Sequence, residues 1–275
     1  MIKVVYSGNS MVFKGIFLSC MSMIKNCKEP LKIYILSMDL TEQNPCFRII
    51  TSEQIAALNK ILKSVNEESE AVLFDVGNIY NELFKNTKNK NTEYTPYCLN
   101  RLFIDLIEDI DGKVIYMDVD TMLVGDIKSL YDVSIDGYEF GAALDFMGKF
   151  WISPTYTNSG IMLINVDEVR RTGMMEKCRK LIQTKWMKMP DQTALNKSVL
   201  RKKYIDGRFN EQRDIKEDTV VKHFCKGIKW TPFFHIYNIK QWETERVHRI
   251  LKIHDFDDIY EKYAELIKIY PAIEG

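Results

Sequence analysis

The chain has 275 residues, of which 46% are hydrophobic and 28% are charged, and its formal net charge is zero. These values are typical of a soluble globular protein, and the length suits one large domain with a substantial core. A neutral chain has no overall attraction to nucleic acid, so a nucleic-acid partner is not expected. The six cysteines form no C-x-x-C pair and predict free thiols in a reducing compartment rather than a disulfide framework.

Strand-like and helix-like patterns alternate through the first half of the chain. The predicted strands are residues 3–7, 31–36, 71–76, 113–118, 138–144 and 160–166, and the predicted helices are 11–26, 52–65 and 96–108. The last of these helices is expected to have Thr95 as its N-cap and Pro96 as its first residue. Such alternation predicts an α/β fold with a Rossmann-like, mainly parallel sheet and helices on both faces.

Three further segments bear on the organisation of the chain. Residues 15–24 are apolar but too few to span a bilayer, which takes about 20 residues, and no small-residue cleavage site follows them. We therefore expect a cytoplasmic protein, in the cytosol or at the inner face of the membrane. The polar segment 85–93 predicts a surface loop, and helix-like spacing from about residue 246 predicts a C-terminal helical extension. The expected division is a main domain at 1–240 and a helical extension at 241–275.

Two carboxylates interrupt the apolar stretch VIYMDVDTMLVGDI, residues 114–127. If the strand continues through them, Asp118 and Asp120 share one face and Val119 points into the core. The apolar runs on both sides make a solvated turn a poor interpretation, so we interpret the two as a functional pair. Ligands of parallel sheets bind at the carboxyl ends of strands, where Ser7 and Asn9 are also predicted to lie.

Four later fragments carry further polar residues of functional type. They are TNSGIMLIN with Asn158, PDQTALN with Asp191 and Gln192 at a helix start, RFN with Asn210, and VVKHFCKGIKW with His223. A helix start favours a carboxylate or an anionic ligand because of its free N–H groups and dipole. Taken singly, the Asp is a helix cap and the His is a structural residue.

Taken together and in this order, the fragments resemble family 8 glycosyltransferases. This retaining, nucleotide-sugar-dependent family includes bacterial lipooligosaccharide galactosyltransferases and glycogenin, and the matching fragments run from residue 4 to about residue 230. The resemblance implies a GT-A type fold whose main domain binds the nucleotide sugar. It also implies transfer of glucose or galactose from a UDP-sugar to a saccharide or glycolipid acceptor, with peripheral membrane contact for the latter.

The resemblance also assigns roles to individual residues. It implies Mn²⁺ or Mg²⁺ as the cofactor, held by Asp118, Asp120 and His223. The residues implied around the transferred sugar are Arg101 (in CLNRLF), Asn158, Asp191 and Gln192. The residues implied for the donor are Ser7 and Asn9 at the nucleoside, Lys229 at the diphosphate, and Asp118, Val119 and Gly227.

The chain departs from the family pattern at three places. Asn9 stands where the family usually has an Asp that contacts the base, and Thr193 replaces the second Asp of an Asp-Gln-Asp run. Lys229 is followed directly by Trp230, without the Pro that the family has between them. Retention normally uses a carboxylate nucleophile, whereas the matching position here is Gln192, so the sequence leaves covalent and front-face routes open.

Two alternative functions compete with a transferase. A haloacid-dehalogenase-like phosphatase would use Asp118 as its nucleophile, although such enzymes usually place this strand at the start of the chain. An inactive nucleotide-sugar-binding protein would not need to keep the residues around the sugar.

Two surface hypotheses concern the later part of the chain. His223 and Lys229 are expected to belong to a segment that closes over the donor, with movement at Cys225–Pro232 and Gly227 supplying unusual φ values. The alternative is a rigid core strand through His223 followed by an ordinary turn. Most of the aromatic residues near the end of the chain are expected to belong to the core. The residues that could instead form a wall near a glycolipid or membrane are Phe233, Phe234, Trp242, Arg246, Arg249 and Lys252.

Overall fold

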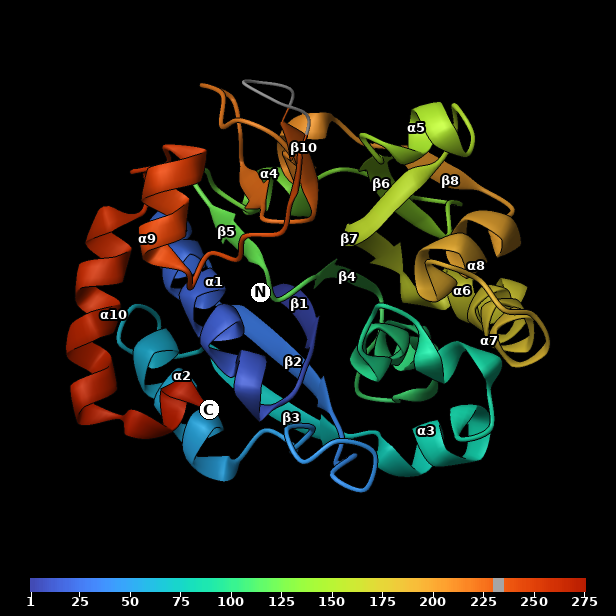
Figure 1. Ribbon diagram of the computed structural model, residues 1–275, viewed down its shortest axis with the longest axis horizontal. Helices are drawn as coiled ribbons and strands as arrows, with labels where there is room; N and C mark the ends of the chain where they lie inside the picture. The colour runs from blue at the N-terminus through green and yellow to red at the C-terminus, as the bar shows by residue number, and fades with distance from the viewer. Residues whose placement is uncertain (230–234) are drawn as a thin grey trace.

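The computed structural model describes residues 1–229 and 235–275, apart from the side chains of Lys90, Asn91, Lys229 and His235. Its centre is a seven-stranded sheet in the order β3-β2-β1-β4-β7-β6-β8 (Figure 1). The strands are β1 (Ile2–Ser7), β2 (Leu31–Ser37), β3 (Glu70–Asp75), β4 (Lys113–Met117), β6 (Phe140–Leu144), β7 (Thr157–Asn165) and β8 (Lys202–Tyr204). Only β7 runs antiparallel to its neighbours, so the predicted mainly parallel sheet is confirmed.

Two short antiparallel pairs accompany the large sheet. The first pairs β5 (Thr121–Leu123) with β9 (Val221–His223), and the second pairs β10 (Gly227–Lys229) with β11 (His235–Tyr237). Because β5 directly follows β4, the first pair brings the chain near residue 223 back to the carboxyl end of β4.

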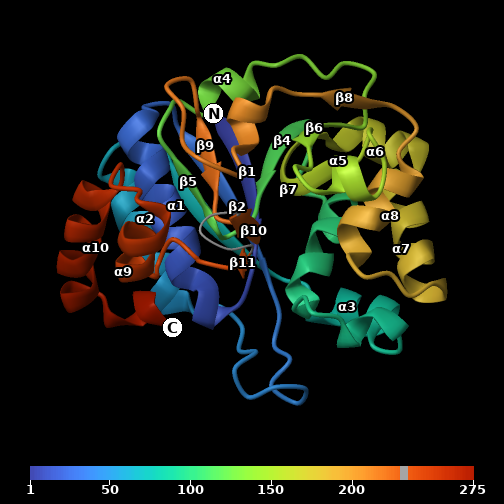
Figure 2. The ribbon, with the colours of Figure 1, turned by 45° about the horizontal axis from the view of Figure 1, so that its top comes forward.

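Helices cover both faces of the sheet, as predicted. In Figure 2, α1, α2, α9 and α10 lie on one side, and α3, α6, α7 and α8 lie on the other. The α-helices are α1 (Phe13–Asn26), α2 (Ser52–Lys63), α3 (Gly77–Phe84), α4 (Lys128–Tyr131), α5 (Gly148–Trp151), α6 (Val166–Thr172), α7 (Met174–Thr184), α8 (Pro190–Ser198), α9 (Thr244–Arg246) and α10 (Asp257–Ile269). The other helical turns are η1 (Ser10–Val12), η2 (Lys88–Asn91), η3 (Pro96–Leu106), η4 (Gly207–Asn210), the π-helical turn η5 (Val247–Leu251) and η6 (Pro271–Glu274).

The alternation of side chains along the strands creates two hydrophobic cores, one on each face of the sheet. In β4, Ile115 and Met117 join the core formed with α1, α2 and α10, whereas Val114 and Tyr116 join the core formed with α3, α7 and α8. A strand buried on both faces is apolar at successive positions, which explains the continuous apolar run before Asp118.

Two local predictions need correction. The helix predicted at 96–108 is a 3₁₀ helix that ends at Leu106, and Thr95 occupies its N-cap position without a side-chain hydrogen bond. The polar segment 85–93 is more than a surface loop, because Thr87 and Asn89 are buried. Both donate hydrogen bonds to the carbonyl of Ile182, so this segment anchors the end of α7.

The C-terminal segment packs against the first helices of the chain. Tyr263 of α10 meets Phe17 of α1 edge to face at 6.1 Å, and Ile259 and Ile273 belong to the same core as α1. The expected helical character beyond residue 246 is therefore present. The segment shares its core with the main domain, and the division between residues 240 and 241 stays a prediction.

The six cysteines have free thiols, as predicted. None of the helices in residues 1–229 and 235–275 combines the length and apolar character needed to cross a membrane.

Candidate active site

Asp118 and Asp120 lie in the turn between β4 and β5, not within a strand. The strand ends at Met117, so the prediction that it continues through Asp118 is wrong. The turn is nevertheless held in place, because the Asp118 N–H donates to the carbonyl of Gly160 at 2.7 Å and Asp120 is only 7% exposed. Val119 packs partly buried against the core, as expected. The two carboxylates are therefore confined by neighbouring strands and not free in solvent.

His223 reaches these carboxylates because its strand pairs with β5. Thr121 lies opposite His223 in this pair, and the imidazole Nε2 is 3.3 Å from Asp120 Oδ1 and 3.8 Å from Asp118 Oδ2. Gly160 makes room for the ring, since a Cβ there would lie 2.2 Å from His223 Cε1. The three predicted metal ligands are thus brought together, and one ligand atom of each lies within 4.8 Å of the other two.

A hydrogen-bond chain orients the ring of His223. Asn210 donates its Nδ2 hydrogen to Asn158 Oδ1 at 2.9 Å, so its Oδ1 faces His223 Nδ1 at 3.0 Å as an acceptor. A ring proton on Nδ1 would satisfy this acceptor, and the Nε2 lone pair would then be available to a cation bound between the two carboxylates. Two carboxylates and one imidazole lone pair that converge in this way fit a divalent cation.

Lys240 is a neighbour of this cluster that the sequence did not reveal. Its ammonium bonds Asp120 Oδ2 and donates to the Phe224 carbonyl at 3.3 Å. Burial alone would raise the pKa of Asp120, but Lys240 and His223 outweigh it and hold that pKa well below its usual range. Lys240 therefore supplies a cation to the same carboxylate that a metal would use.

Arg101 links the turn to the start of α8. This residue of η3 is 3% exposed, and its guanidinium lies 2.7 Å from Asp118 Oδ1 and 3.1 Å from Asp191 Oδ2. The guanidinium also lies over the ring of Tyr116, 4.3 Å from its centre. Burial would lower the pKa of Arg101, but Asp118, Tyr116 and Asp191 raise it overall, while burial raises the pKa of Asp191 despite Arg101.

Asn158 and Gln192 meet on a carboxylate that the sequence analysis missed. Asn158 Nδ2 donates to Asp145 Oδ2 at 2.9 Å, and Gln192 Nε2 donates to the same oxygen at 3.2 Å. Gln192 Oε1 accepts from the Ser159 N–H at 3.0 Å. Asp145 directly follows β6, so the rule that ligands gather at strand ends would have found it.

Ser7 and Asn9 lie at the carboxyl end of β1, beside the end of β4. Tyr6 pairs with Met117 in the parallel register, so Ser7 and Asp118 leave neighbouring strands side by side. Ser7 Oγ donates to the Tyr97 carbonyl at 2.7 Å, and Asn9 Oδ1 accepts from a backbone N–H of η1 at 3.2 Å. Both side chains therefore have local structural partners.

A hollow of about 420 Å³ lies between two segments that contact Ser7 and Asn9. Its lining residues are Gln43, Asn44, Phe47, Thr92, Glu93, Tyr94, Thr95 and Pro96. Asn9 Nδ2 donates to the Cys46 carbonyl at 3.4 Å within the first segment, and Tyr97 directly follows the second. This hollow therefore adjoins the residues expected at the nucleoside.

Gly227 does not supply the unusual φ values that were predicted for it. Its φ is not in the left-handed region, and it sits in β10 opposite Tyr237. A Cβ at this position would lie 2.4 Å from the Tyr237 ring, so glycine is required for space and not for backbone freedom. The Lys229 side chain and residues 230–234 lie outside the described residues, and the closing segment stays a prediction.

The predicted aromatic and basic wall is only partly described. Phe233 and Phe234 lie outside the described residues, whereas Trp242 packs against the core next to Gly15. The charges of Arg246 and Arg249 are matched by nearby glutamates on the same helical segment. Membrane contact through this wall therefore stays a prediction.

Comparison with known proteins identifies the family. Residues 3–232 match the model described as Glycosyl transferase family 8. The chain belongs to glycosyltransferase family 8. This membership excludes the haloacid-dehalogenase-like phosphatase, in which Asp118 would have been the nucleophile.

Several glycosyltransferases share this sequence pattern. Glycosyltransferase GlyB of Streptococcus pneumoniae serotype 4 is 27% identical over 250 residues, which cover 86% of this chain and 56% of GlyB. A candidate glycosyltransferase of Haemophilus influenzae is 26% identical in an alignment of 297 positions, gaps included, that covers 97% of this chain and 85% of that protein. The family 8 chain thus spans little more than half of GlyB.

Solved structures confirm the fold of this family 8 glycosyltransferase. LgtC, a galactosyltransferase solved with donor and acceptor sugar analogs, aligns with a TM-score of 0.66 and 16% identity over 98% of this chain and 96% of LgtC. The glycosyltransferase GlyE of Streptococcus pneumoniae TIGR4 aligns with a TM-score of 0.65 and 17% identity over 96% of this chain and 64% of GlyE. The predicted α/β, GT-A type fold is therefore confirmed.

Proposed function

We propose that this family 8 glycosyltransferase is a retaining hexosyltransferase. It moves glucose or galactose from a UDP-sugar to a saccharide or glycolipid acceptor, and it requires Mn²⁺ or Mg²⁺. The observation that carries the proposal is the convergence of Asp118, Asp120 and His223 on one point.

The metal site suits the chemistry of a leaving diphosphate. When bound, a divalent cation would act as a Lewis acid that stabilises the negative charge on the departing UDP. Oxygen-rich ligand sets favour Mn²⁺ and Mg²⁺, and the phosphates would supply further oxygens. The chain's own contribution is to fix the three ligands, through Gly160 behind the ring and Asn210 at its Nδ1.

The sugar is proposed to lie against Arg101, Asn158, Asp191 and Gln192, with Asp145 as an additional contact. Arg101 contacts both Asp118 and Asp191, and the Ser159 hydroxyl links Asp191 to Gln192, so these side chains form one group beside the metal cluster. Sugar hydroxyls both donate and accept, so a site that alternates carboxylate, amide and guanidinium groups suits them. Retention and the choice of hexose rest on the family resemblance.

The nucleoside is proposed to lie by Ser7 and Asn9, next to the hollow that adjoins them. Val119, Gly227 and Lys229 complete the proposed donor site. Asn9 replaces the usual acidic contact to the base, and its amide can both donate to and accept from uracil.

The acceptor is proposed to approach over α5. The turn that follows Asp145 leads directly into this helix, where Asp145 Oδ1 accepts from the Gly148 N–H at 2.6 Å. Phe150 and Trp151 are 72% and 80% exposed, which is unusual for such large apolar side chains. An exposed aromatic surface beside the sugar group suits stacking against a saccharide or contact with a lipid.

A thermal-shift screen tests the donor. UDP-, GDP- and CMP-sugars are added to the protein with and without Mn²⁺, and the Asp118→Ala variant serves as the control. A bound donor stabilises the native state, so UDP-glucose or UDP-galactose should raise the Tm of the wild type in a metal-dependent manner. A larger shift with a GDP- or CMP-sugar than with every UDP-sugar would overturn the donor assignment.

A further inference from the structure

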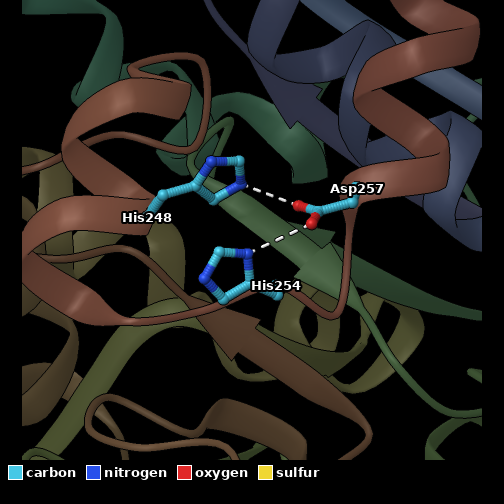
Figure 3. A group of neighbouring side chains, drawn as sticks. All are labelled: His248, His254 and Asp257. Carbon is cyan, nitrogen blue, oxygen red and sulfur yellow. Dashed lines mark hydrogen bonds and ion pairs between the residues drawn. The ribbon is translucent and has the colours of Figure 1, made fainter.

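A second group of metal-ligand type lies in the C-terminal segment. His248, His254 and Asp257 converge, and one ligand atom of each lies within 4.8 Å of the other two (Figure 3). His248 Nε2 is 2.7 Å from Asp257 Oδ1, and His254 Nδ1 is 3.1 Å from Asp257 Oδ2. These residues are distinct from the ligands of the catalytic cluster, and no role in sugar transfer requires them.

The backbone around this group is shaped to bring the two histidines together. His248 lies in the π-helical turn η5, and Lys252 follows it with φ 60° and ψ 32°. Within residues 1–229 and 235–275, Lys252 is the only residue other than glycine with positive φ. A left-handed conformation is unfavourable for an L-residue, so it persists where the surrounding structure fixes it. The reversal at Lys252 returns His254 to His248.

The two imidazole rings are stacked face to face. Their centres are 4.5 Å apart and their planes are inclined by 20°. Two protonated rings at this distance would repel each other, whereas two neutral rings can each present a lone pair to one cation.

We propose that His248, His254 and Asp257 form a second metal site, which binds a zinc-class ion. Two imidazole nitrogens and one carboxylate oxygen suit Zn²⁺ and its neighbours, whereas Mn²⁺ and Mg²⁺ prefer oxygen ligands. Zinc–ligand bonds of about 2.0–2.2 Å in tetrahedral geometry separate ligand atoms by roughly 3.3 Å, and the two histidine–aspartate separations of 2.7 Å and 3.1 Å lie close to this value. His254 is 63% exposed, which leaves a fourth position open to water.

The site would tie η5 to the first turn of α10. Asp257 is the first residue of α10, and the same helix reaches the catalytic domain through Lys25 of α1 and Asp258, which form an ion pair of 2.7 Å. Tyr260, one turn further along α10, contacts both His248 and the sulfur of Met122 in β5. A bound ion would therefore stabilise the packing of the C-terminal segment. Both ligand nitrogens must be unprotonated, so each ring then carries its hydrogen on the other nitrogen.

Zinc titration of a chain whose catalytic cluster is disabled tests the proposal. The background is Asp118→Asn with Asp120→Asn, the protein carries no histidine tag, and it is stripped with chelator before use. Isothermal titration measures Zn²⁺ binding, and Co²⁺ absorption reports the coordination. His254→Gln and Asp257→Asn remove one ligand each. Asp258→Asn removes the same charge from the adjacent residue of the helix and serves as the matched control.

We expect about one equivalent of Zn²⁺ per chain, a rise in Tm on binding, and affinity at least tenfold weaker in His254→Gln and Asp257→Asn. The Asp258→Asn control should bind as the background does. No zinc binding by the folded background, or affinity changed less than twofold by both ligand variants, would overturn the proposal. Circular dichroism in chelator checks that each variant is folded. Because the background lacks the catalytic metal ligands, this outcome is independent of the proposed transferase function.

Discussion

Gly160→Ala is the perturbation that tests most sharply how the metal ligands are held. The added Cβ would lie 2.2 Å from His223 Cε1 and 2.9 Å from Asp118 Oδ2. Ordinary contacts begin at 3.4 Å, so the imidazole would have to retreat by about 1.2 Å. The backbone N–H of His223 donates a hydrogen bond to the Glu211 carbonyl at 2.9 Å, which holds the backbone in place. The ring must therefore rotate away instead. Metal–ligand distances tolerate only about 0.2 Å, and this movement removes the histidine from the site.

We therefore expect Gly160→Ala to bind Mn²⁺ at least about 100-fold more weakly, with a stability cost of about 1–3 kcal/mol from overpacking. Isothermal titration with Mn²⁺ in the presence of UDP measures the first effect, and urea unfolding in chelator measures the second. Gly207→Ala is the matched control, because a Cβ there meets nothing within 4 Å. Mn²⁺ affinity within threefold of wild type in folded Gly160→Ala would refute this reasoning.

Three further predictions concern Asp120, Lys240 and α5. Lys240→Met should raise metal affinity about tenfold or more. The reason is that the Lys240 ammonium competes with the metal for Asp120 through a charged hydrogen bond worth about 1.5–3 kcal/mol. Unchanged affinity in Mn²⁺ titration would exclude this competition. In chelator, Asp120→Ala should unfold at a lower urea concentration than Asp118→Ala, with a free energy of unfolding about 2 kcal/mol smaller. The reason is that Lys240 would keep only a carbonyl partner, whereas Arg101 would keep Asp191. The reverse order in urea unfolding would contradict this. Trp151→Ala should reduce acceptor-dependent turnover about tenfold and leave donor hydrolysis unchanged; equal loss of both rates would place Trp151 outside the acceptor site.

The local elements of the fold were predictable because they follow periodicity. The strand before Asp118 is apolar at successive positions, and this pattern comes directly from burial on both faces of the sheet. The end of that strand was placed one residue too far along, since an apolar run does not mark where hydrogen-bonded pairing stops. The buried part of segment 85–93 was missed because Thr87 and Asn89 are anchored by hydrogen bonds to α7, and polar composition does not reveal such contacts.

The grouping of the three candidate metal ligands was predictable from motif order, but their surroundings were not. Asp118, Asp120 and His223 are brought together by the pairing of β5 with β9, as the resemblance implied. Lys240 meets Asp120 across 120 residues of sequence, and no local pattern signals such a contact. Asp145 differs, because it follows a strand directly and the same rule that selected Asp118 applies to it.

The most direct test of the proposed function is metal-dependent release of UDP from UDP-glucose and UDP-galactose. The account predicts slow release with Mn²⁺ and water, faster release with an acceptor, and at least about 100-fold less in chelator or in His223→Ala. A nucleotide-sugar-binding protein without transfer activity would bind the donor and release no UDP. UDP release at the same rate in chelator, or no release from either donor with Mn²⁺ and a panel of saccharide and glycolipid acceptors, would contradict the account.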